Sequence, residues 1–109
     1  MSMKVAIVQP LYIPWMGYFG LIDASDTFVF LDDVQFEKQS WQNRNRIKTP
    51  NGSMWLTVPV SFSFGDRIHE VKIENRHRWQ KDHYKSFVFN YAKAPFFDVY
   101  EPFLREMYE

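Results

Sequence analysis

Two short apolar runs, separated by one loop and one short helical pattern, constrain the fold of this chain more than any other feature. Residues 4–10 read KVAIVQP, which predicts a buried strand closed by proline. Residues 27–31 read TFVFL and predict a second strand, and between the two Tyr18, Leu21 and Ile22 recur at helical spacing. So short a crossover predicts parallel strands with a right-handed connection, and it places a ligand at the loop after the first strand.

A β-hairpin is predicted next. Residues 44–49 and 53–60 are rich in strand formers, and they flank the turn sequence Pro50-Asn51-Gly52. Successive side chains of a strand point to opposite faces. The basic side chains Arg44, Arg46 and Lys48 therefore project from one face, and Asn43, Asn45 and Ile47 project from the other.

The remaining residues predict a short strand and two helices. Residues 68–73 alternate imperfectly and predict a strand, and Asn75 is a candidate cap for a helix that runs to about residue 93. The apolar face of that helix consists of Trp79, His83, Phe87 and Tyr91, spaced four residues apart. A final helix from about residue 97 tolerates Pro102 only in or near its first turn.

These elements predict a single α/β domain over residues 1–109, in which a strand–helix–strand unit precedes a β-hairpin and C-terminal helices. The apolar side chains Phe103, Leu104 and Met107 find no place in this core. We therefore expect the domain to be part of a larger fold or to extend its core against a partner, as in a homo-oligomer.

Charge and composition exclude several function classes. Formal net charge is zero, and residues 38–54 contain four basic side chains and no acidic one. One local basic block fits a small anionic ligand better than nucleic acid, which calls for a domain-wide positive excess, although a solvated surface strand is the alternative. The absence of cysteine excludes disulfides, thiolate zinc sites and a cysteine nucleophile. No apolar run approaches a membrane span and no signal peptide is evident, so we expect a cytoplasmic protein.

Few residues offer catalytic chemistry. The three histidines lack metal-ligand spacing, and His83 on the apolar helix face is typical of a core histidine. A triad of Ser40, His83 and Asp32 lacks the glycines of a nucleophile elbow. Asp33 and its acidic neighbour follow the second strand, where one carboxylate could act as a base or hold Mg²⁺, or where both simply form a polar strand end.

Three motifs carry a family resemblance. They are QP-x-Y-x-P-x-x-GYF-x-LI over residues 9–22, DDVQ-F-x-K over residues 32–38 and W-x-NRN-x-I over residues 41–47. With these motifs the chain resembles the N-terminal half of the WbqC-like protein family, whose genes accompany those for bacterial O-antigen and other surface polysaccharides. That resemblance implies a glycyl or acyl transferase that acts on an amino sugar or sugar nucleotide, and it specifies no cofactor.

The first unit is also similar, at the level of fold, to Rossmann-like and nucleotidylyltransferase-like proteins in a degenerate form. Trp15 and Tyr18 stand where the phosphate-binding histidines of nucleotidylyltransferases would be. Nucleotidyl chemistry is therefore not expected even if the fold is shared.

The transferase hypothesis assigns roles to most of the candidate residues. Asp33 is the base that accepts the amine proton, Arg44, Arg46 and Lys48 clamp a diphosphate or carboxylate, and Gln9 orients the substrate amide. Asn43 and Asn45 contact sugar hydroxyls, and Trp41 and Tyr12 stack on the ligand. Tyr18 and Lys38 are further candidate substrate-binding residues. The alternative is a non-catalytic module that binds a sugar nucleotide or a partner protein.

Overall fold

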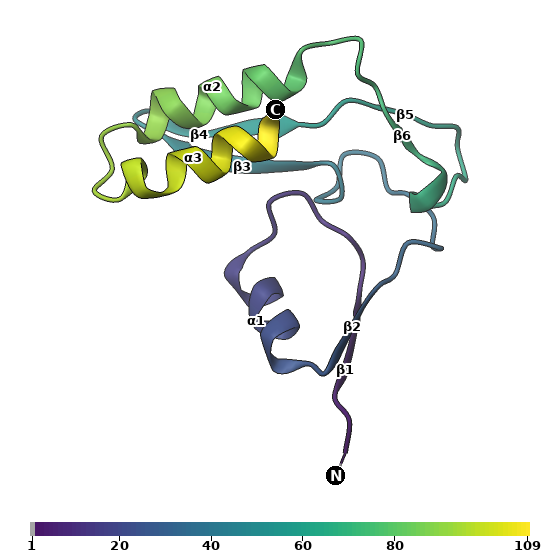
Figure 1. Ribbon diagram of the computed structural model, residues 1–109. Helices are drawn as coiled ribbons and strands as arrows, with labels where there is room; N and C mark the ends of the chain where they lie inside the picture. Colours follow the sequence, from purple (N-terminus) through teal and green to yellow (C-terminus); the bar gives the residue numbers. More distant parts are fainter. Residues whose placement is uncertain (1) are drawn as a thin grey trace.

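The computed structural model describes residues 2–109, and it begins with the predicted strand–helix–strand unit (Figure 1). Strand β1 (Val5–Val8) and strand β2 (Thr27–Phe30) pair in parallel, and helix α1 (Met16–Ala24) connects them. Ser25 ends the helix, because its backbone N–H and its hydroxyl both bond to the carbonyl oxygen of Ile22. The predicted arrangement of these three elements is confirmed.

The prediction that β1 is buried is wrong. Val5 is 49% exposed and Ile7 is 59% exposed, and Val29 on β2 is 40% exposed. Among residues 2–109 these two strands pair only with each other, so a single nine-residue helix has to cover their apolar side chains. Its main contribution is Tyr18, which is buried with its ring centroid 5.4 Å from that of Phe28.

The β-hairpin forms as predicted. Strand β3 (Arg44–Thr49) pairs antiparallel with strand β4 (Gly52–Thr57), and Thr49 lies opposite Gly52 across the turn. Gly52 has a φ of +123°, which favours glycine at this position. The alternation of faces also holds, because Ile47 and Leu56 are buried on the inner face while Arg46 and Lys48 are exposed on the outer face.

The segment after the hairpin departs from the prediction. Strand β4 stops at Thr57, and a separate short strand β5 (Val60–Ser61) follows Pro59 and pairs with β6 (Lys72–Ile73). The strand expected over residues 68–73 is wrong in its first half, where a 3₁₀ turn, η1 (Ile68–Glu70), forms. The side chain of Glu70 accepts the backbone N–H of Arg67 at 2.9 Å and thereby stabilises the turn.

Two helices complete the chain. Helix α2 (Trp79–Tyr91) starts later than predicted, and Asn75 does not cap it. Instead, the Oδ1 atom of Asn75 accepts the indole N–H of Trp79 at 3.0 Å and a side-chain N–H of Gln80 at 3.1 Å. Helix α3 (Phe97–Tyr108) contains Pro102 in its second turn.

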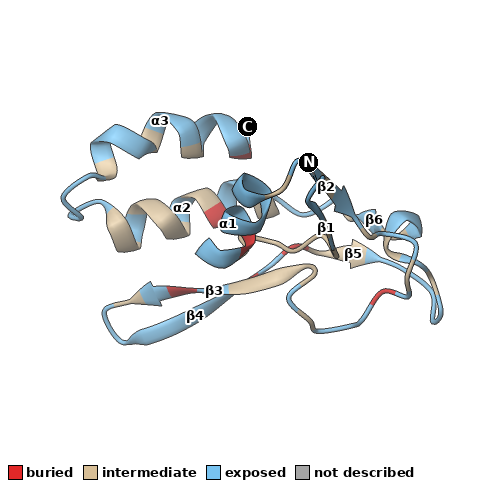
Figure 2. Cartoon of the chain, turned by 90° about the horizontal axis from the view of Figure 1, so that it is seen from below, coloured by how far each residue is buried: buried red, intermediate tan, exposed pale blue. Residues whose placement is uncertain are grey.

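The helices and the hairpin lie in layers, with α2 between β3–β4 and α3 (Figure 2). The phenol of Tyr91 on α2 accepts the backbone N–H of Lys48 on β3 at 2.9 Å. The phenol of Tyr84 on α2 donates to the carboxylate of Glu101 on α3. The core between these layers is small and includes Val58, His83 and Tyr108 as buried residues.

The coarse α/β class is confirmed, whereas the Rossmann-like and nucleotidylyltransferase-like types are not. Over residues 2–109 the structure has three separate two-stranded sheets instead of one extended parallel sheet. Within the same residues no helix has both the length and the hydropathy needed to cross a membrane.

Candidate functional site

The loop that follows β1 is held against the base of the hairpin by side chains that the sequence singled out. The side-chain N–H of Gln42 donates to the side-chain oxygen of Gln9 at 2.9 Å, and the phenol of Tyr18 donates to the backbone oxygen of Gln9 at 3.0 Å. The polar groups of Gln9 and Tyr18 therefore hold the loop after β1 in place.

Asn45 makes the second attachment of this loop. Its side-chain N–H group donates to the carbonyl oxygens of Tyr12 at 3.1 Å and Ile13 at 2.7 Å. Ile13 has a φ of +47°, in the left-handed region that β-branched residues rarely adopt. In the same loop the backbone N–H of Tyr12 donates to the carbonyl oxygen of Trp41 at 3.1 Å. Asn45 therefore fixes the conformation of the loop that the sequence predicted to bind a ligand.

A partly buried chain of hydrogen bonds runs from Tyr108 through Tyr12 to His83. Because Nε2 of His83 lies 3.0 Å from the carbonyl oxygen of Thr57, Nε2 carries the proton and Nδ1 is an acceptor. The phenol of Tyr12 then donates to Nδ1 at 2.6 Å, and the phenol of Tyr108 donates to Tyr12. Burial raises the pKa of Tyr12 and lowers the pKa of His83, so both side chains are neutral at pH 7.

His83 is thus a core histidine, as its place on the helix face predicted. The triad of Ser40, His83 and Asp32 does not form, because both ring nitrogens of His83 are bonded elsewhere and the hydroxyl of Ser40 donates to the carbonyl oxygen of Glu37. Among residues 2–109 no three His, Asp or Glu side chains gather as metal ligands.

The outer face of the hairpin carries a stack of cations and aromatic rings. The guanidinium carbon of Arg44 lies 4.1 Å from the ring centroid of Trp55, and that of Arg46 lies 5.3 Å from the same centroid. Arg46 is also 5.8 Å from the centroid of Trp41, and the two tryptophan centroids are 5.4 Å apart. Sequence reasoning missed Trp55, although the hairpin register places it directly opposite Arg46.

A charged cavity of about 280 Å³ lies beside this stack. Its polar lining comes from Lys38, Gln39, Asn43, Arg44 and Thr57, and its apolar lining comes from Phe36, Val60 and Phe62. Two of these residues each hold one polar atom, Oδ1 of Asn43 and Nε of Arg44, that is inaccessible to solvent and has no hydrogen-bond partner among the described residues.

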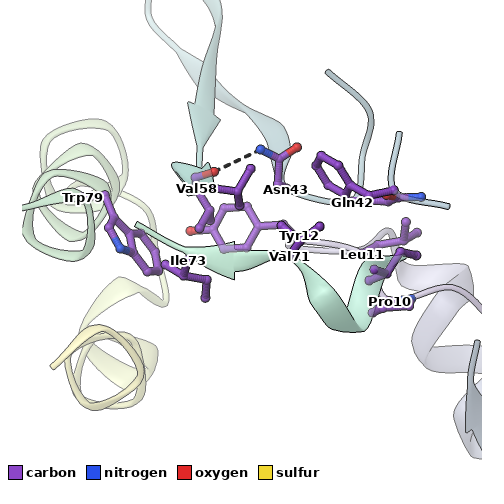
Figure 3. Close-up of a pocket in the computed structure, with 12 residues that line it drawn as sticks. Pro10, Leu11, Tyr12, Gln42, Asn43, Val58, Val71, Ile73 and Trp79 are labelled. Atoms are coloured by element: carbon purple, nitrogen blue, oxygen red, sulfur yellow. Dashed lines mark hydrogen bonds between the residues drawn. The ribbon is translucent and has the colours of Figure 1, made fainter. Parts of the chain in front are cut away.

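An apolar cavity of about 250 Å³ shares Phe36, Asn43 and Val60 with the charged cavity (Figure 3). The ring of Tyr12 lies within it, with Trp79 and Ile73 at one side and Leu11 at the other. Asn43 bounds both cavities, and its side-chain N–H donates to the carbonyl oxygen of Val58 at 3.0 Å. This hydrogen bond orients the side chain of Asn43, which lines both cavities.

A third cavity, of about 350 Å³, has two tryptophans in its lining. Trp15 and Trp41 bound it together with Leu11, Pro14 and Asn45. The side chains of Trp15 and Trp41 are about half exposed. The indole of Trp15 packs on Gly17, where an added Cβ would lie 2.1 Å from the indole nitrogen. A ligand ring that entered this cavity would therefore meet aromatic faces.

Five of the predicted site residues line none of these three cavities, namely Gln9, Tyr18, Asp33, Arg46 and Lys48. Asp33 is exposed in the segment after β2, and it lines none of the three cavities described above. The neighbouring backbone is fixed, because Asp32 and Val34 accept backbone N–H groups of His69 at 3.0 Å and Ile68 at 2.9 Å. Lys48 is exposed near the turn of the hairpin, on the same face as Arg46.

Comparison with known proteins gives the family. A model of the WbqC-like protein family matches residues 9–109, which include every predicted site residue. The chain is also 46% identical over 107 residues to a protein of Mycobacterium tuberculosis (strain ATCC 25618 / H37Rv) named Uncharacterized protein Rv1507c. The match covers 96% of this chain and 46% of that relative, so the chain spans about half the relative's length. No solved structure matches the chain. The chain belongs to the WbqC-like protein family.

Proposed function

We propose that this protein binds an amino sugar or a sugar nucleotide and transfers a glycyl or other acyl group to it during the assembly of a bacterial O-antigen or another surface polysaccharide. The observation that carries the proposal is the stack of Arg44, Arg46, Trp41 and Trp55 on the outer hairpin face. It combines fixed positive charge with exposed aromatic faces.

This combination suits a ligand that has both a diphosphate and rings. Guanidinium groups bind phosphate oxygens through paired N–H donors. Because these arginines already stack on tryptophan, they lose less conformational freedom when a ligand binds. Trp41 is 46% exposed and Trp55 is 44% exposed, so each retains area for a sugar or a base. The third basic residue of the face, Lys48, adds charge near the turn.

The proposed reaction is acyl transfer to an amine. The amine nitrogen of the sugar attacks the acyl carbonyl carbon, a carbon–nitrogen bond forms, and the bond from that carbon to the leaving group breaks with its electron pair. The carboxylate of Asp33 accepts the proton that the amine loses. Asp33 is exposed and is therefore accessible to a bound substrate.

A second candidate function is a module that binds the sugar nucleotide without chemistry. The position of Asp33 favours it, because this carboxylate lines none of the cavities beside the arginine–tryptophan stack. Under this alternative the arginines are required for ligand binding, and replacing Asp33 changes no function.

Two variants distinguish the candidates. Binding of uridine and thymidine diphosphate sugars is measured by calorimetry, and amide products formed with glycyl and acetyl donors are measured by mass spectrometry. We expect Arg46→Ala to weaken sugar-nucleotide binding by tenfold or more, whereas Lys81→Ala, on an exposed position of α2, leaves it unchanged. If the protein is a transferase, Asp33→Asn is expected to lower the turnover rate without changing the affinity for the sugar nucleotide. Asp23→Asn is the control and is expected to change neither. If the wild-type protein binds no sugar nucleotide, the proposal is wrong.

A further inference from the structure

Two tryptophans from separate segments of the chain line the same cavity of about 350 Å³. Trp15 directly precedes α1 and Trp41 lies shortly before β3, and their side chains are 57% and 46% exposed. Leu11 and Pro14 add apolar surface to the lining, and Asn45 completes it. Exposed aromatic surface that gathers around one cavity is typical of a ligand-binding site. The cavity therefore offers aromatic and apolar faces to a ligand.

The side chains of this lining have few free hydrogen-bonding groups. Apart from the two indoles, Asn45 has the one polar side chain among them. Its amide is engaged within the protein, because the nitrogen donates to two carbonyl oxygens of the loop and the oxygen accepts the backbone N–H of Arg46 at 2.7 Å. The nitrogen of the Trp15 indole lies against Gly17. These side chains therefore offer a ligand little hydrogen bonding beyond the indole N–H of Trp41.

Such a lining distinguishes the two kinds of ring in a sugar nucleotide. A sugar ring carries several hydroxyls, and a hydroxyl that enters a cavity of this kind loses water without gaining a partner. A nucleobase has a flat face without hydroxyls, and its stacking on aromatic side chains needs no hydrogen bonds. Because both indoles are exposed, the polar edge of a stacked base can stay in the solvent. The cavity therefore suits a nucleobase better than a sugar.

Positive charge lies next to this cavity. The guanidinium carbon of Arg46 is 5.8 Å from the ring centroid of Trp41, and Arg44 and Arg46 share the ring of Trp55. In a nucleoside diphosphate, one ribose separates the base from the phosphates. A base stacked on Trp41 therefore places its phosphates near Arg46. The cavity and the arginines follow each other in the order in which a nucleotide carries its base and its phosphates.

The loop that carries Trp15 is held in place before any ligand binds. Ile13, two residues earlier, has a φ of +47°, and Asn45 donates to its carbonyl oxygen at 2.7 Å. A strained backbone conformation persists only where the surrounding structure holds it. A ligand that enters the cavity therefore does not have to order this loop, and binding loses less conformational entropy.

We propose that this cavity is the nucleobase subsite for the sugar nucleotide, in which the base stacks on Trp15 and Trp41. The inference rests on the proposed function, because it assigns the nucleotide end of that substrate to the loop before α1 and the phosphates to the arginines. Stacking recognises the face of a base and not its polar edge. The subsite therefore accepts uridine, thymidine and adenosine nucleotides with similar affinity.

Calorimetry with small probes tests this assignment on the wild-type protein. Uridine diphosphate supplies a base and an anion, pyrophosphate supplies the anion alone, and glucose 1-phosphate supplies the sugar end of the substrate. We expect uridine diphosphate to bind at least tenfold more tightly than pyrophosphate or glucose 1-phosphate. Adenosine diphosphate is expected to bind within about fivefold of uridine diphosphate.

Three variants of the protein separate the base from the phosphates. Trp15→Leu removes an aromatic face but keeps an apolar side chain, so we expect about a tenfold loss of affinity for uridine diphosphate and none for pyrophosphate. Trp15→Phe keeps an aromatic face and is expected to lose less than about threefold. Arg46→Ala is expected to weaken the binding of both probes.

The matched control is Phe64→Leu. Phe64 is 96% exposed and lines none of the cavities described above, so this variant is expected to bind every probe as the wild type does. Thermal melts show whether each variant is folded, and the comparison of probes on the wild-type protein does not depend on any variant.

Four outcomes would overturn the inference. Pyrophosphate binding as tight as that of uridine diphosphate would show that the base contributes nothing, and equally tight glucose 1-phosphate would place recognition at the sugar end. A strong preference for one base would require hydrogen bonds that this lining does not supply. Equal affinity for uridine diphosphate in Trp15→Leu and Phe64→Leu would place the base outside the cavity. In each case the proposed function stands if uridine diphosphate sugars bind, whereas both fail if no sugar nucleotide binds at all.

Discussion

The phenolic oxygen of Tyr12 lies 2.6 Å from Nδ1 of His83, and this hydrogen bond joins the loop after β1 to helix α2 across 71 positions of the sequence. The same phenol bonds to Tyr108 at the end of α3. Since the loop also supports the tryptophan-lined cavity, the bond connects the packing of the helices with the shape of the candidate site.

Replacing Tyr12 by phenylalanine is expected to destabilise the protein. The variant leaves Nδ1 of His83 buried without a donor and removes the acceptor of Tyr108, so the free energy of unfolding is expected to fall by about 1–3 kcal/mol. Urea denaturation followed by tryptophan fluorescence measures the change. Tyr100→Phe, at a position that is 63% exposed, serves as the control and is expected to have no effect. An unchanged unfolding midpoint in Tyr12→Phe would show that the network contributes nothing to stability.

The stability of the protein is expected to decrease in mild acid. Burial lowers the pKa of His83 below its usual 6.5, while the carboxylate of Asp82 and the bond to Thr57 oppose this shift more weakly. The unfolded chain therefore binds a proton on this imidazole at a higher pH than the folded chain does. The contribution of His83 is complete above about pH 6.5 and is lost as the pH falls from there through the pKa of the folded state.

Thermal melts between pH 8 and pH 5 measure this dependence. His83→Gln removes the titrating group while keeping a side-chain donor and acceptor, so its melting temperature is expected to fall less over that range. His77→Gln, at an exposed position before α2, is expected to behave like the wild type. A wild-type curve that parallels that of His83→Gln would contradict the assignment.

The sequence predicts most where local chemistry decides the structure. The alternation of side chains in residues 44–49 and the turn sequence that ends at Gly52 were sufficient to predict the hairpin and its two faces. Asn75 failed as a helix cap because its side-chain oxygen accepts from Trp79 and Gln80 instead, and cap propensity does not include such competition. The prediction that β1 is buried failed because burial depends on which other elements cover the strand, and the local sequence does not encode that.

The candidate site divides in the same way. The charge of Arg44 and Arg46 was evident from the sequence, but their shared packing on Trp55 and the cavity that only Arg44 lines form only after folding. Tyr12 was expected to stack on a ligand, yet its hydroxyl forms hydrogen bonds with His83 and Tyr108. Asp33 remains a prediction, because no contact in the structure connects it to the arginines.

Gly17 and Gly20 form a matched pair on α1 that tests the cavity lined by Trp15 and Trp41. Ala at position 17 would place its Cβ 2.1 Å from the indole nitrogen of Trp15, so the indole has to move, whereas nothing lies within 4 Å of a Cβ at position 20. We expect Gly20→Ala to stabilise the protein by up to about 1 kcal/mol through helix propensity. Gly17→Ala is expected to stabilise the protein less than Gly20→Ala does and to weaken the binding of uridine diphosphate sugars. Tryptophan fluorescence and calorimetry measure both effects, and equal behaviour of the two variants would show that Trp15 takes no part in binding.

Helix α3 presents an apolar stripe that predicts self-association. Phe96, Val99, Phe103 and Met107 recur at helical spacing, and each is between 51% and 70% exposed. Exposed apolar patches of this kind commonly mark protein–protein contacts, and a stripe on a helix suits a second copy of the same helix. Sedimentation velocity at increasing protein concentration is therefore expected to show dimers, and Phe103→Glu is expected to raise the dissociation constant at least tenfold. Asp98→Asn removes a charge from an exposed position on a different side of the same helix, and it is expected to leave dimerisation unchanged. A wild-type protein that stays monomeric at high concentration would exclude the helix as a self-association surface.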